Sequence, residues 1–311
     1  MKLLVSSAPH ITGKDTTASL MRDLIIAMVP ALVASTLFFR VQSLILTAVS
    51  VLACVAFEYL YEKMLKKPIT VGDLSAAVTG ILLAFNCPPT LPLWTVVIGA
   101  FFAIVIVKQL FGGLGYNFAN PAIVARIILG LGYTGLMTSW TFPATVSGDA
   151  VASATPLAVY AAGGTVNYLD MFVGSTGGVL GETSALALLL GFVYLVVRKV
   201  ISPTIPVTYV ATVAVLAVVL GVDPVVYVLG GGLLLGAIFM ATDYVTSPYT
   251  EKGKIIFGIG LGLITVIIRR FGSMTEGVSY AILLMNLVVP YINKATRQKP
   301  LGAPKAVKEA K

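Results

Sequence analysis

The segment from Asp149 to Thr155 brings a carboxylate and two hydroxyl groups together among small residues, in the order Asp149-x-x-x-Ser153-Ala154-Thr155. A hydroxyl flanked by small residues leaves room for a bulky group, and Asp149 is placed to present it, or a metal, to an incoming phosphate. The hydroxyl of Thr155 is therefore a candidate point of attachment for such a group. By spacing alone, a threonine in a turn before Pro156 is the commoner explanation of the same residues.

A second candidate site begins at Asn117 and Asn120, which precede Pro121 at the expected start of a helix. Asparagine is a favoured N-cap and proline a favoured first helical residue, so capping alone explains the pattern. Side-chain amides also offer paired donors and acceptors to a bound molecule, and the two roles are compatible. Arg126 follows about a turn and a half later in apolar sequence, where a cation should face a partner or a cavity.

Three acidic residues are candidates for an ion path. Asp243 closes an apolar run, whereas Asp73 and Glu182 stand where helices are expected to start. Ionisable groups at membrane depth are functional candidates by default. The alternatives are an ordinary interfacial acid near Lys252 for Asp243, and carboxylates favoured by helix dipoles for the other two.

The composition predicts the setting of these residues. Hydrophobic residues make up 58% of the 311-residue chain and charged residues only 11%, against about 25% charged in soluble proteins. We therefore expect an all-α integral membrane protein. The net charge is +8, but the basic residues cluster at span edges and in the tail, which is typical of membrane topology and argues against nucleic-acid binding. His10 is the sole histidine, and Cys54 and Cys87 fit no metal spacing, so no metal site is predicted.

About ten apolar segments are expected to be membrane helices, several of them short or broken. A span needs about 20 apolar residues, and short or Gly/Pro-interrupted segments recur in transporters with a site near the middle of the bilayer. One long connection separates two halves, and its aromatic residues predict a folded loop rather than a disordered one. The expected helices are Met21–Phe39, Val41–Tyr61, Asp73–Phe85, Leu93–Leu110, Pro121–Gly132, Thr183–Val197, Ile205–Leu220, Val225–Thr242, Ile255–Ile268 and Val278–Ile292.

The two halves show weak internal repetition. Residues 72–76 resemble residues 181–185, and residues 89–92 resemble residues 203–206. Five spans per half is an odd number, so consecutive copies would insert in opposite orientations as inverted repeats. The alternative is chance resemblance between apolar, proline-punctuated segments. The predicted organisation is one membrane domain at 1–311, with repeats at 21–132 and 183–292, the long extracytoplasmic loop at 133–182 and a basic tail at 293–311.

The basic residues predict the orientation, because cytoplasmic loops carry an excess of lysine and arginine. Those before the first span and after each even-numbered span all fall on one side. Both termini are then cytoplasmic, and the loop with Thr155 faces outward. Arg40 and the Arg269–Arg270 pair fall on the outer side and are exceptions to the rule.

Four motifs in a fixed order resemble a known family over nearly the whole chain. They are residues 7–11, residues 111–122, the segment at 149–155 and residues 239–243. Together they look like the D subunits of Rnf complexes, which are related to the B subunits of sodium-pumping NADH:quinone reductases. The family's flavin attachment pattern is Ser/Thr-Gly-Ala-Thr. The sequence Ala152-Ser153-Ala154-Thr155 departs from it at two positions and keeps the Ala-Thr pair.

The resemblance implies a multi-pass subunit of a bacterial or archaeal cell membrane. It implies an enzyme complex that passes electrons between reduced ferredoxin and NAD⁺ and couples this to Na⁺ or H⁺ translocation. It also implies covalent FMN as a phosphoester on Thr155, with Asp149, Ser153 and Ala154 around the acceptor. The implied partners are the other Rnf subunits (A, B, C, E and G) and a flavin transferase, besides the lipid bilayer.

By the same resemblance, Asn117 and Asn120 are candidates for a noncovalent second flavin, riboflavin. Arg126 would then offset the negative charge of a reduced flavin. The sequence contains no nucleotide-binding loop and no iron–sulfur cysteines, so the complete activity needs other subunits. A channel or secondary transporter for a small solute, with urea-transporter-like architecture, is the alternative, because fold alone does not determine function.

Overall fold

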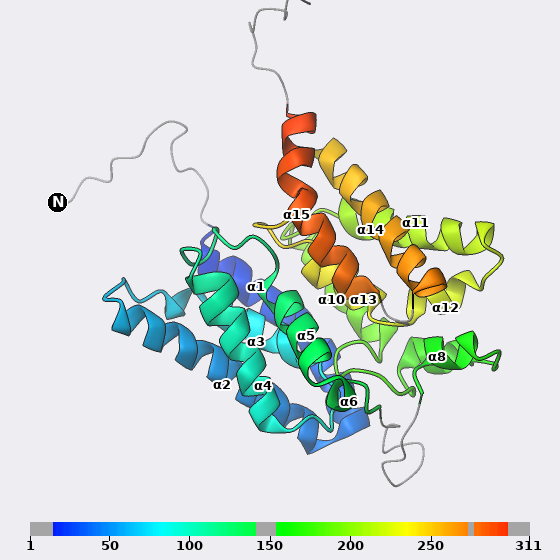
Figure 1. Ribbon diagram of the computed structural model, residues 1–311, viewed down its shortest axis with the longest axis horizontal. Coiled ribbons are helices and arrows are strands. Elements are labelled where there is room, and N and C mark those ends of the chain that lie inside the picture. The colour runs from blue at the N-terminus through cyan, green and yellow to red at the C-terminus, as the bar shows by residue number, and fades with distance from the viewer. Residues whose placement is uncertain (1–14, 141–153, 273–276, 298–311) are drawn as a thin grey trace, which may run out of the picture.

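The computed structural model describes residues 15–140, 154–272 and 277–297, and these residues form helices without any strand (Figure 1). Three helices are long and apolar enough to cross a membrane, namely α1, α2 and α15, and several shorter helices are equally apolar. The protein is therefore a multi-pass membrane protein. In chain order the elements are α1 (Thr17–Phe39), α2 (Val41–Met64), η1 (Val71–Asp73), α3 (Ser75–Phe85), α4 (Leu93–Phe101), η2 (Phe102–Gln109), α5 (Pro121–Gly132), α6 (Thr134–Met137), α8 (Pro156–Ala161), α9 (Tyr168–Val173), α10 (Ala185–Val197), α11 (Thr204–Val219), α12 (Pro224–Leu229), α13 (Leu233–Leu235), η3 (Gly236–Met240), α14 (Glu251–Phe271) and α15 (Val278–Thr296).

Each apolar segment predicted from the sequence is helical, and most ends lie within a few residues of the prediction. The largest difference is the segment expected at Val225–Thr242, which is divided into α12, α13 and the π-helix η3. Gly231 and Gly232 both have positive φ angles, 68° and 67°, which glycine adopts without steric cost. The two glycines therefore break the expected helix, whereas the apolar residues on both sides of them are helical.

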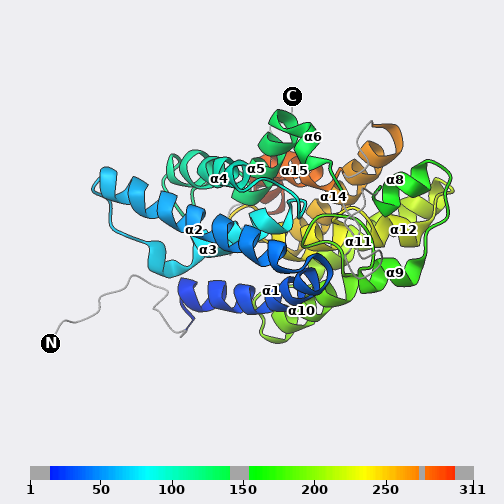
Figure 2. The same cartoon turned by 90° about the horizontal axis from the view of Figure 1, so that it is seen from below.

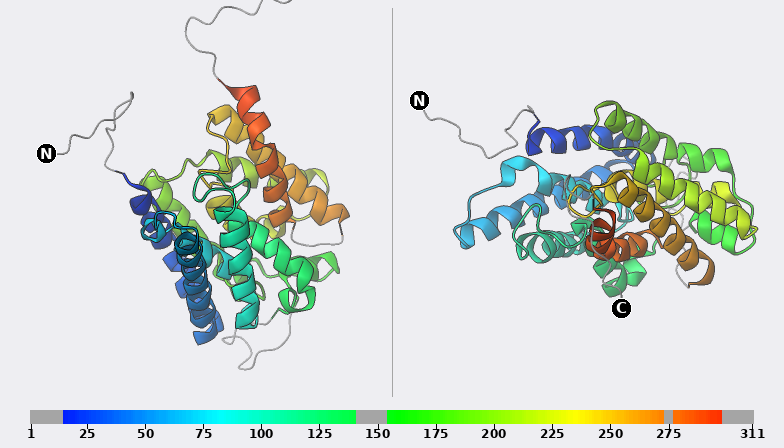
Figure 3. Two further views of the ribbon diagram at one scale, coloured as in Figure 1. Left: turned by 60° about the vertical axis from the view of Figure 1, so that its left-hand side comes forward. Right: turned by 90° about the horizontal axis from the view of Figure 1, so that it is seen from above.

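The main packing partners include helices that are far apart in the sequence as well as neighbouring ones. Helix α1 packs against α10 from the other half (Figure 2), and α11 and α15 both pack against α14 (Figure 3). The repeated motifs at residues 72–76 and 181–185 lead into helices with different neighbours. The first precedes α3, which packs against α2, and the second precedes α10, which packs against α1.

Helix α3 is too short to cross a bilayer, and its end is closed by hydrogen bonds from a distant segment. The backbone N–H groups of Leu180 and Gly181 donate to the carbonyl oxygens of Cys87 and Phe85, at 3.1 and 2.9 Å. Irregular backbone at membrane depth is tolerated only where protein or water satisfies it. The segment before α10 thus provides the acceptors at the end of α3 with donors inside the protein.

The contact between α1 and α10 depends on Gly191. A Cβ atom at Gly191 would lie 2.3 Å from the carbonyl oxygen of Ala27 and 2.9 Å from Phe239 Cζ. We expect Gly191→Ala to lower the free energy of unfolding by about 1–3 kcal/mol, the range for overpacking a tight core. Thermal unfolding in detergent measures the effect. The control is Gly130→Ala in α5, where a Cβ would meet no atom within 4 Å; equal stability of the two variants would contradict the expectation.

Candidate functional site

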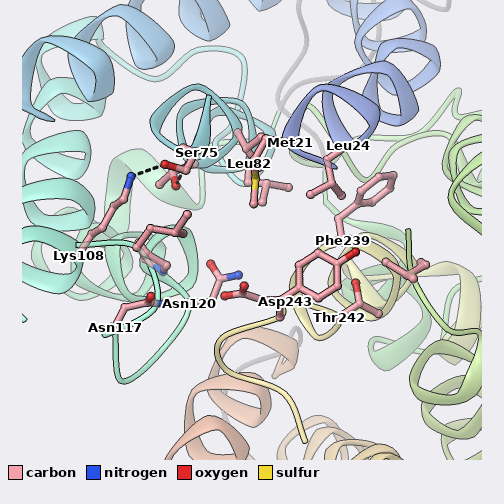
Figure 4. Close-up of a pocket in the computed structure, with 16 residues that line it drawn as sticks. Met21, Leu24, Ser75, Leu82, Lys108, Asn117, Asn120, Phe239, Thr242 and Asp243 are labelled. Atoms are coloured by element: carbon pink, nitrogen blue, oxygen red, sulfur yellow. Dashed lines mark hydrogen bonds between the residues drawn. The ribbon is translucent and has the colours of Figure 1, made fainter. Parts of the chain in front are cut away.

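Asn117, Asn120 and Asp243 line one cleft between the two halves of the chain (Figure 4). Ser75 and Lys108 lie at another side of it, and Phe239, Leu82 and Leu24 give it apolar walls. The cleft therefore combines side-chain amides, a carboxylate and apolar surface. Mostly apolar walls with a few polar groups are typical of small-molecule sites, although the volume of this cleft, about 70 Å³, is below the roughly 300–1,000 Å³ of such sites.

Two π-helical segments deliver the charged residues to this cleft. Segment η2 ends with Lys108 and Gln109, and η3 ends at Met240, three residues before Asp243. The wider turn of a π-helix changes which side chains face inward, and such segments occur frequently at functional sites. Each half of the chain thus brings one charged residue to the cleft at the end of such a segment.

Asn120 combines the two roles that the sequence left open. Its Oδ1 accepts from the backbone N–H groups of Ala122 and Ile123, at 3.0 and 3.4 Å, so it caps α5 as predicted. Its Nδ2 donates to the carbonyl oxygen of Met240 at 3.4 Å, across to the other half. Asn117 Nδ2 donates to the carbonyl oxygen of Ala119 at 3.0 Å. Both amides therefore reach the cleft with defined orientations.

A buried asparagine that the sequence analysis did not select holds the two sides of the cleft together. Asn286 on α15 is 3% exposed. Assigned from its hydrogen bonds, its amide accepts from the backbone N–H of Asn120 and donates to the carbonyl oxygen of Thr246, both at 3.1 Å. Thr246 Oγ1 in turn donates to Asp243 Oδ2 at 3.1 Å. Asn286 thus links the start of α5 to the loop that positions Asp243.

A buried ion pair borders the cleft and was also missed. Lys108 Nζ donates to Glu58 Oε1 and to Ser75 Oγ, both at 2.6 Å, and Gln109 Nε2 donates to Glu58 Oε1 at 2.9 Å. Lys108 and Glu58 are 2% and 0% exposed. Glu58 Oε2 has no hydrogen-bond partner in the described part of the chain. A glutamate within the expected second span was the available signal, since a charge at membrane depth is rarely without a role.

The other predicted charged residues lie in two further places. Asp73 Oδ1 accepts from Ser75 Oγ at 2.5 Å, so it adjoins the cleft through Ser75. Arg126 is buried deeper along α5, where its Nη1 donates to Ser279 Oγ at 2.7 Å and it interacts electrostatically with Glu182. Neither Arg126 nor Glu182 lines the cleft. Asp243 therefore lines the cleft itself, Asp73 reaches it only through Ser75, and Glu182 lies away from it.

Thr155 lies apart from this cleft. It is 4% exposed and caps α8, its Oγ1 accepting from the backbone N–H of Ala158 at 3.4 Å. Helix α8 lies on the side of the molecule toward which α5 ends, whereas the cleft is at the start of α5 (Figure 1). The 12 residues of α5 span about 18 Å at 1.5 Å per residue. Ala154 is exposed, and Asp149 and Ser153 lie outside the described residues.

Hydrogen bonds hold the helix that follows Thr155 against the rest of the molecule. Tyr160 Oη on α8 accepts from the backbone N–H of Asp223 at 2.8 Å. Tyr168 Oη on α9 donates to the Asp223 carboxylate, and this bond raises the pKa of the Tyr168 phenol above its ordinary value. Asp223 also caps α12. The position of Thr155 is therefore coupled to α12 through Asp223.

Residues 4–302 match the model of the NQR2, RnfD, RnfE family. The chain belongs to this family. A relative from Acetobacterium woodii, named as the D subunit of a Na(+)-translocating ferredoxin:NAD(+) oxidoreductase complex, is 51% identical over 100% of this chain and 99% of its own length. The D subunit of the proton-translocating ferredoxin:NAD(+) oxidoreductase complex of Clostridium ljungdahlii is 40% identical over 96% of each chain. The D subunit of an ion-translocating oxidoreductase complex of Methanosarcina acetivorans is 36% identical, again over 96% of each chain. Members of the family named in this way thus resemble the chain from end to end.

Proposed function

We propose that this chain is the flavin-carrying membrane subunit of an Rnf-type complex, which passes electrons between reduced ferredoxin and NAD⁺ and couples this to Na⁺ or H⁺ translocation. The observation that carries the proposal is the 51% identity, over the whole chain, with a subunit of a complex named for that activity. The partners proposed with it are the A, B, C, E and G subunits and a flavin transferase. The membrane would be the cell membrane of a bacterium or archaeon.

Thr155 is the proposed acceptor for covalent FMN. A flavin supplies the redox chemistry, and the protein holds it and tunes its potential. Among the described residues, the Thr155 hydroxyl accepts one long hydrogen bond, 3.4 Å from Ala158 N, so little is lost when a phosphoester replaces it. The neighbouring Ala154 is exposed and small, which leaves space beside the acceptor. The residues at this position therefore fit the attached group.

The cleft at Asn117 and Asn120 is the proposed site of riboflavin. An isoalloxazine ring has apolar faces and a polar imide edge, and the cleft offers apolar walls and two amides. Asn120 would keep its cap on α5 through Oδ1 while its Nδ2, whose bond to Met240 is long at 3.4 Å, turns to the ring. Lys108 at the same cleft is ion-paired with Glu58, so Arg126 stays the residue proposed to offset the charge of a reduced flavin.

The ion path is proposed to include Asp243, which lines the cleft, and Asp73, which accepts a hydrogen bond from Ser75 at another side of it. Glu182, the third predicted acid, interacts electrostatically with Arg126, which lies farther along α5. One of its carboxylate oxygens is buried and has no hydrogen-bond partner among the described residues. A buried oxygen without a hydrogen-bond partner lowers the stability of the fold. Glu182 therefore stays among the residues proposed for the ion path.

The proposed architecture is ten membrane helices in two inverted five-helix repeats. Under this proposal α1 corresponds to α10, and α5 corresponds to α15. Helix α1 packs on α10, and α5 packs on α15, as expected for equivalent elements related by a two-fold axis. The packing of α2 on α3 likewise recurs as α11 on α12. This register replaces the one suggested by the short sequence motifs.

The proposed orientation puts both termini in the cytoplasm and α8 outside. Figure 1 shows the end of α15 at the upper edge and α8 on the lower side. Cysteines introduced at Ala162 and Ala295, both exposed, test this assignment. A membrane-impermeant thiol reagent should label Ala162→Cys in intact cells and Ala295→Cys only after lysis. Cys54 and Cys87 are 0% exposed and give a low background. Labelling of Ala295→Cys alone in intact cells would reverse the orientation.

The proposed flavin content is tested on the purified chain. After complete denaturation and electrophoresis, the band should still fluoresce yellow under ultraviolet light, because a covalent flavin survives denaturation. A noncovalent flavin should appear in the released fraction. A colourless band and a flavin-free supernatant from a correctly inserted protein would reject the proposal and favour a channel or transporter.

A further inference from the structure

A large cavity lies beside the helix that starts at Thr155. Its volume is about 550 Å³, within the roughly 300–1,000 Å³ typical of small-molecule sites. Tyr160 on α8, Tyr227 on α12 and the pair Arg269 and Arg270 at the end of α14 line it. No aspartate or glutamate is among the described lining residues. The lining thus favours an aromatic ligand with negative charge.

Direct packing connects Thr155 to this cavity. Leu157 lies two residues beyond Thr155 and lines the cavity. A Cβ atom at Gly231 would meet Leu157 Cδ1 at 2.3 Å and Arg269 Nη2 at 2.8 Å. The start of α8 therefore lies near Arg269, with Gly231 between Leu157 and the guanidinium. A group attached to Thr155 begins within reach of the cavity.

Arg269 has a structural role that fixes its position. Its Nη1 donates to the carbonyl oxygen of Tyr227 at 2.5 Å, and its Nη2 donates to those of Gly230 and Gly231 at 2.9 and 3.1 Å. Its guanidinium also lies 5.7 Å from the centre of the Tyr227 ring. Arg269 therefore closes the end of α12 and holds one wall of the cavity.

Arg270 has no comparable structural role. Its side chain is exposed, and no hydrogen bond or ion pair joins it to the residues that the structure describes. It is also on the side where the positive-inside rule disfavours arginine. A basic residue in the last turn of a helix is favoured by the dipole, but Arg269 already supplies one. The second positive charge at the cavity thus needs a separate explanation.

We propose that this cavity receives the isoalloxazine ring of the flavin carried by Thr155, with Arg270 facing its negatively charged reduced form. The inference rests on the proposed function, since it requires a flavin at Thr155. Tyr160 and Tyr227 form aromatic walls, and Arg269 keeps them in place. Arg270 is then a binding residue that stabilises the reduced flavin over the oxidised one.

The midpoint potential of the covalent flavin tests the role of Arg270. Removing a positive charge near the ring should destabilise the reduced form, so Arg270→Gln should lower the potential. A change of about tenfold in the ratio of reduced to oxidised flavin corresponds to about 30 mV for a two-electron couple. Arg270→Lys should restore most of the shift. Arg40→Gln, which removes the other exposed outer arginine, is the control and should leave the potential unchanged.

A second pair of variants tests the cavity itself. Ala161 lines the cavity and Ala162 does not, although both are exposed. Ala161→Trp fills the cavity and should expose the flavin, so that iodide quenches its fluorescence more strongly than in the wild type. In Ala162→Trp, iodide should quench the flavin fluorescence only as strongly as in the wild type. Equal quenching in both variants, or an unchanged potential in Arg270→Gln, overturns the inference.

Intact-mass measurement on every sample separates the two proposals. If the wild type carries FMN and the variants behave as the wild type does, the cavity is not the site of the isoalloxazine ring, and the proposed function still stands. Wild type without FMN rejects the proposed function, and the inference falls with it. Variants that carry FMN and show the shifted potential and the increased quenching support both.

Discussion

Thr155→Val should abolish covalent flavin and leave the protein inserted in the membrane. Valine keeps the shape of threonine and lacks the hydroxyl that forms the phosphoester, so the expected loss of attached FMN is complete. The variant also loses the cap on α8, which costs about 0.5–2 kcal/mol. Intact-mass analysis of the purified chain measures the attachment, and membrane fractionation measures insertion.

Thr155→Ser is the matched control, because serine keeps both the hydroxyl and the cap. Serine can cap α8 as threonine does, so Thr155→Ser should keep the stability that Thr155→Val loses. Comparing the two variants separates an effect on folding from an effect on flavin attachment. A Thr155→Val protein whose mass still includes FMN would place the attachment elsewhere, with Ser153 as the next candidate. That result would remove the proposed role of Thr155.

The double variant Asn117→Ala and Asn120→Ala should lose the noncovalent flavin. If the two amides hold the polar edge of the ring, each truncation leaves a buried partner unpaired at roughly 1–3 kcal/mol. The two losses sum to roughly 2–6 kcal/mol, so affinity should fall by about one and a half to four powers of ten, at about tenfold per 1.4 kcal/mol. Flavin attached to Thr155 should be unaffected, because a covalent bond holds it. Mild denaturation, followed by separation of released from retained flavin, gives both quantities.

The cap of Asn120 on α5 makes a second variant necessary. Asn117→Ala with Asn120→Ser keeps a capping oxygen and lacks the Asn120 amide. Released flavin should fall in this variant as it does in the double alanine variant, while thermal stability should stay closer to that of the wild type. Undiminished release from either variant would leave the two asparagines with capping and local hydrogen bonds only.

The helices could be predicted from the sequence because their signals are local. Apolar length set the segments, and Asn120 with Pro121 marked the start of α5 as the structure has it. The convergence of Asn117 with Asp243 from the other half could not be predicted in this way. It depends on the packing of α5 against α15 and on the hydrogen bonds of Asn286, which no spacing along the chain reveals.

Two other features could not be predicted from the sequence, for physical reasons. The ion pair of Lys108 with Glu58 joins residues 50 positions apart, and a lysine near the end of the expected helix Leu93–Leu110 is typical of a membrane edge. The π-helical turn of η2 brings it inside instead. The Arg269–Arg270 pair was noticed only as an exception to the orientation rule. Its place at a cavity beside α8 depends on tertiary packing that brings the end of α14 near the start of α8, and the sequence does not reveal that packing.

A peptide mass measurement tests the attachment of flavin to Thr155 most directly, on the wild-type chain produced in cells that contain the flavin transferase. The peptide containing Thr155 should carry the mass of one FMN less one water, and fragmentation should place this group on Thr155. A peptide found only in its unmodified form, or a group located on another residue, would show that Thr155 does not carry the flavin.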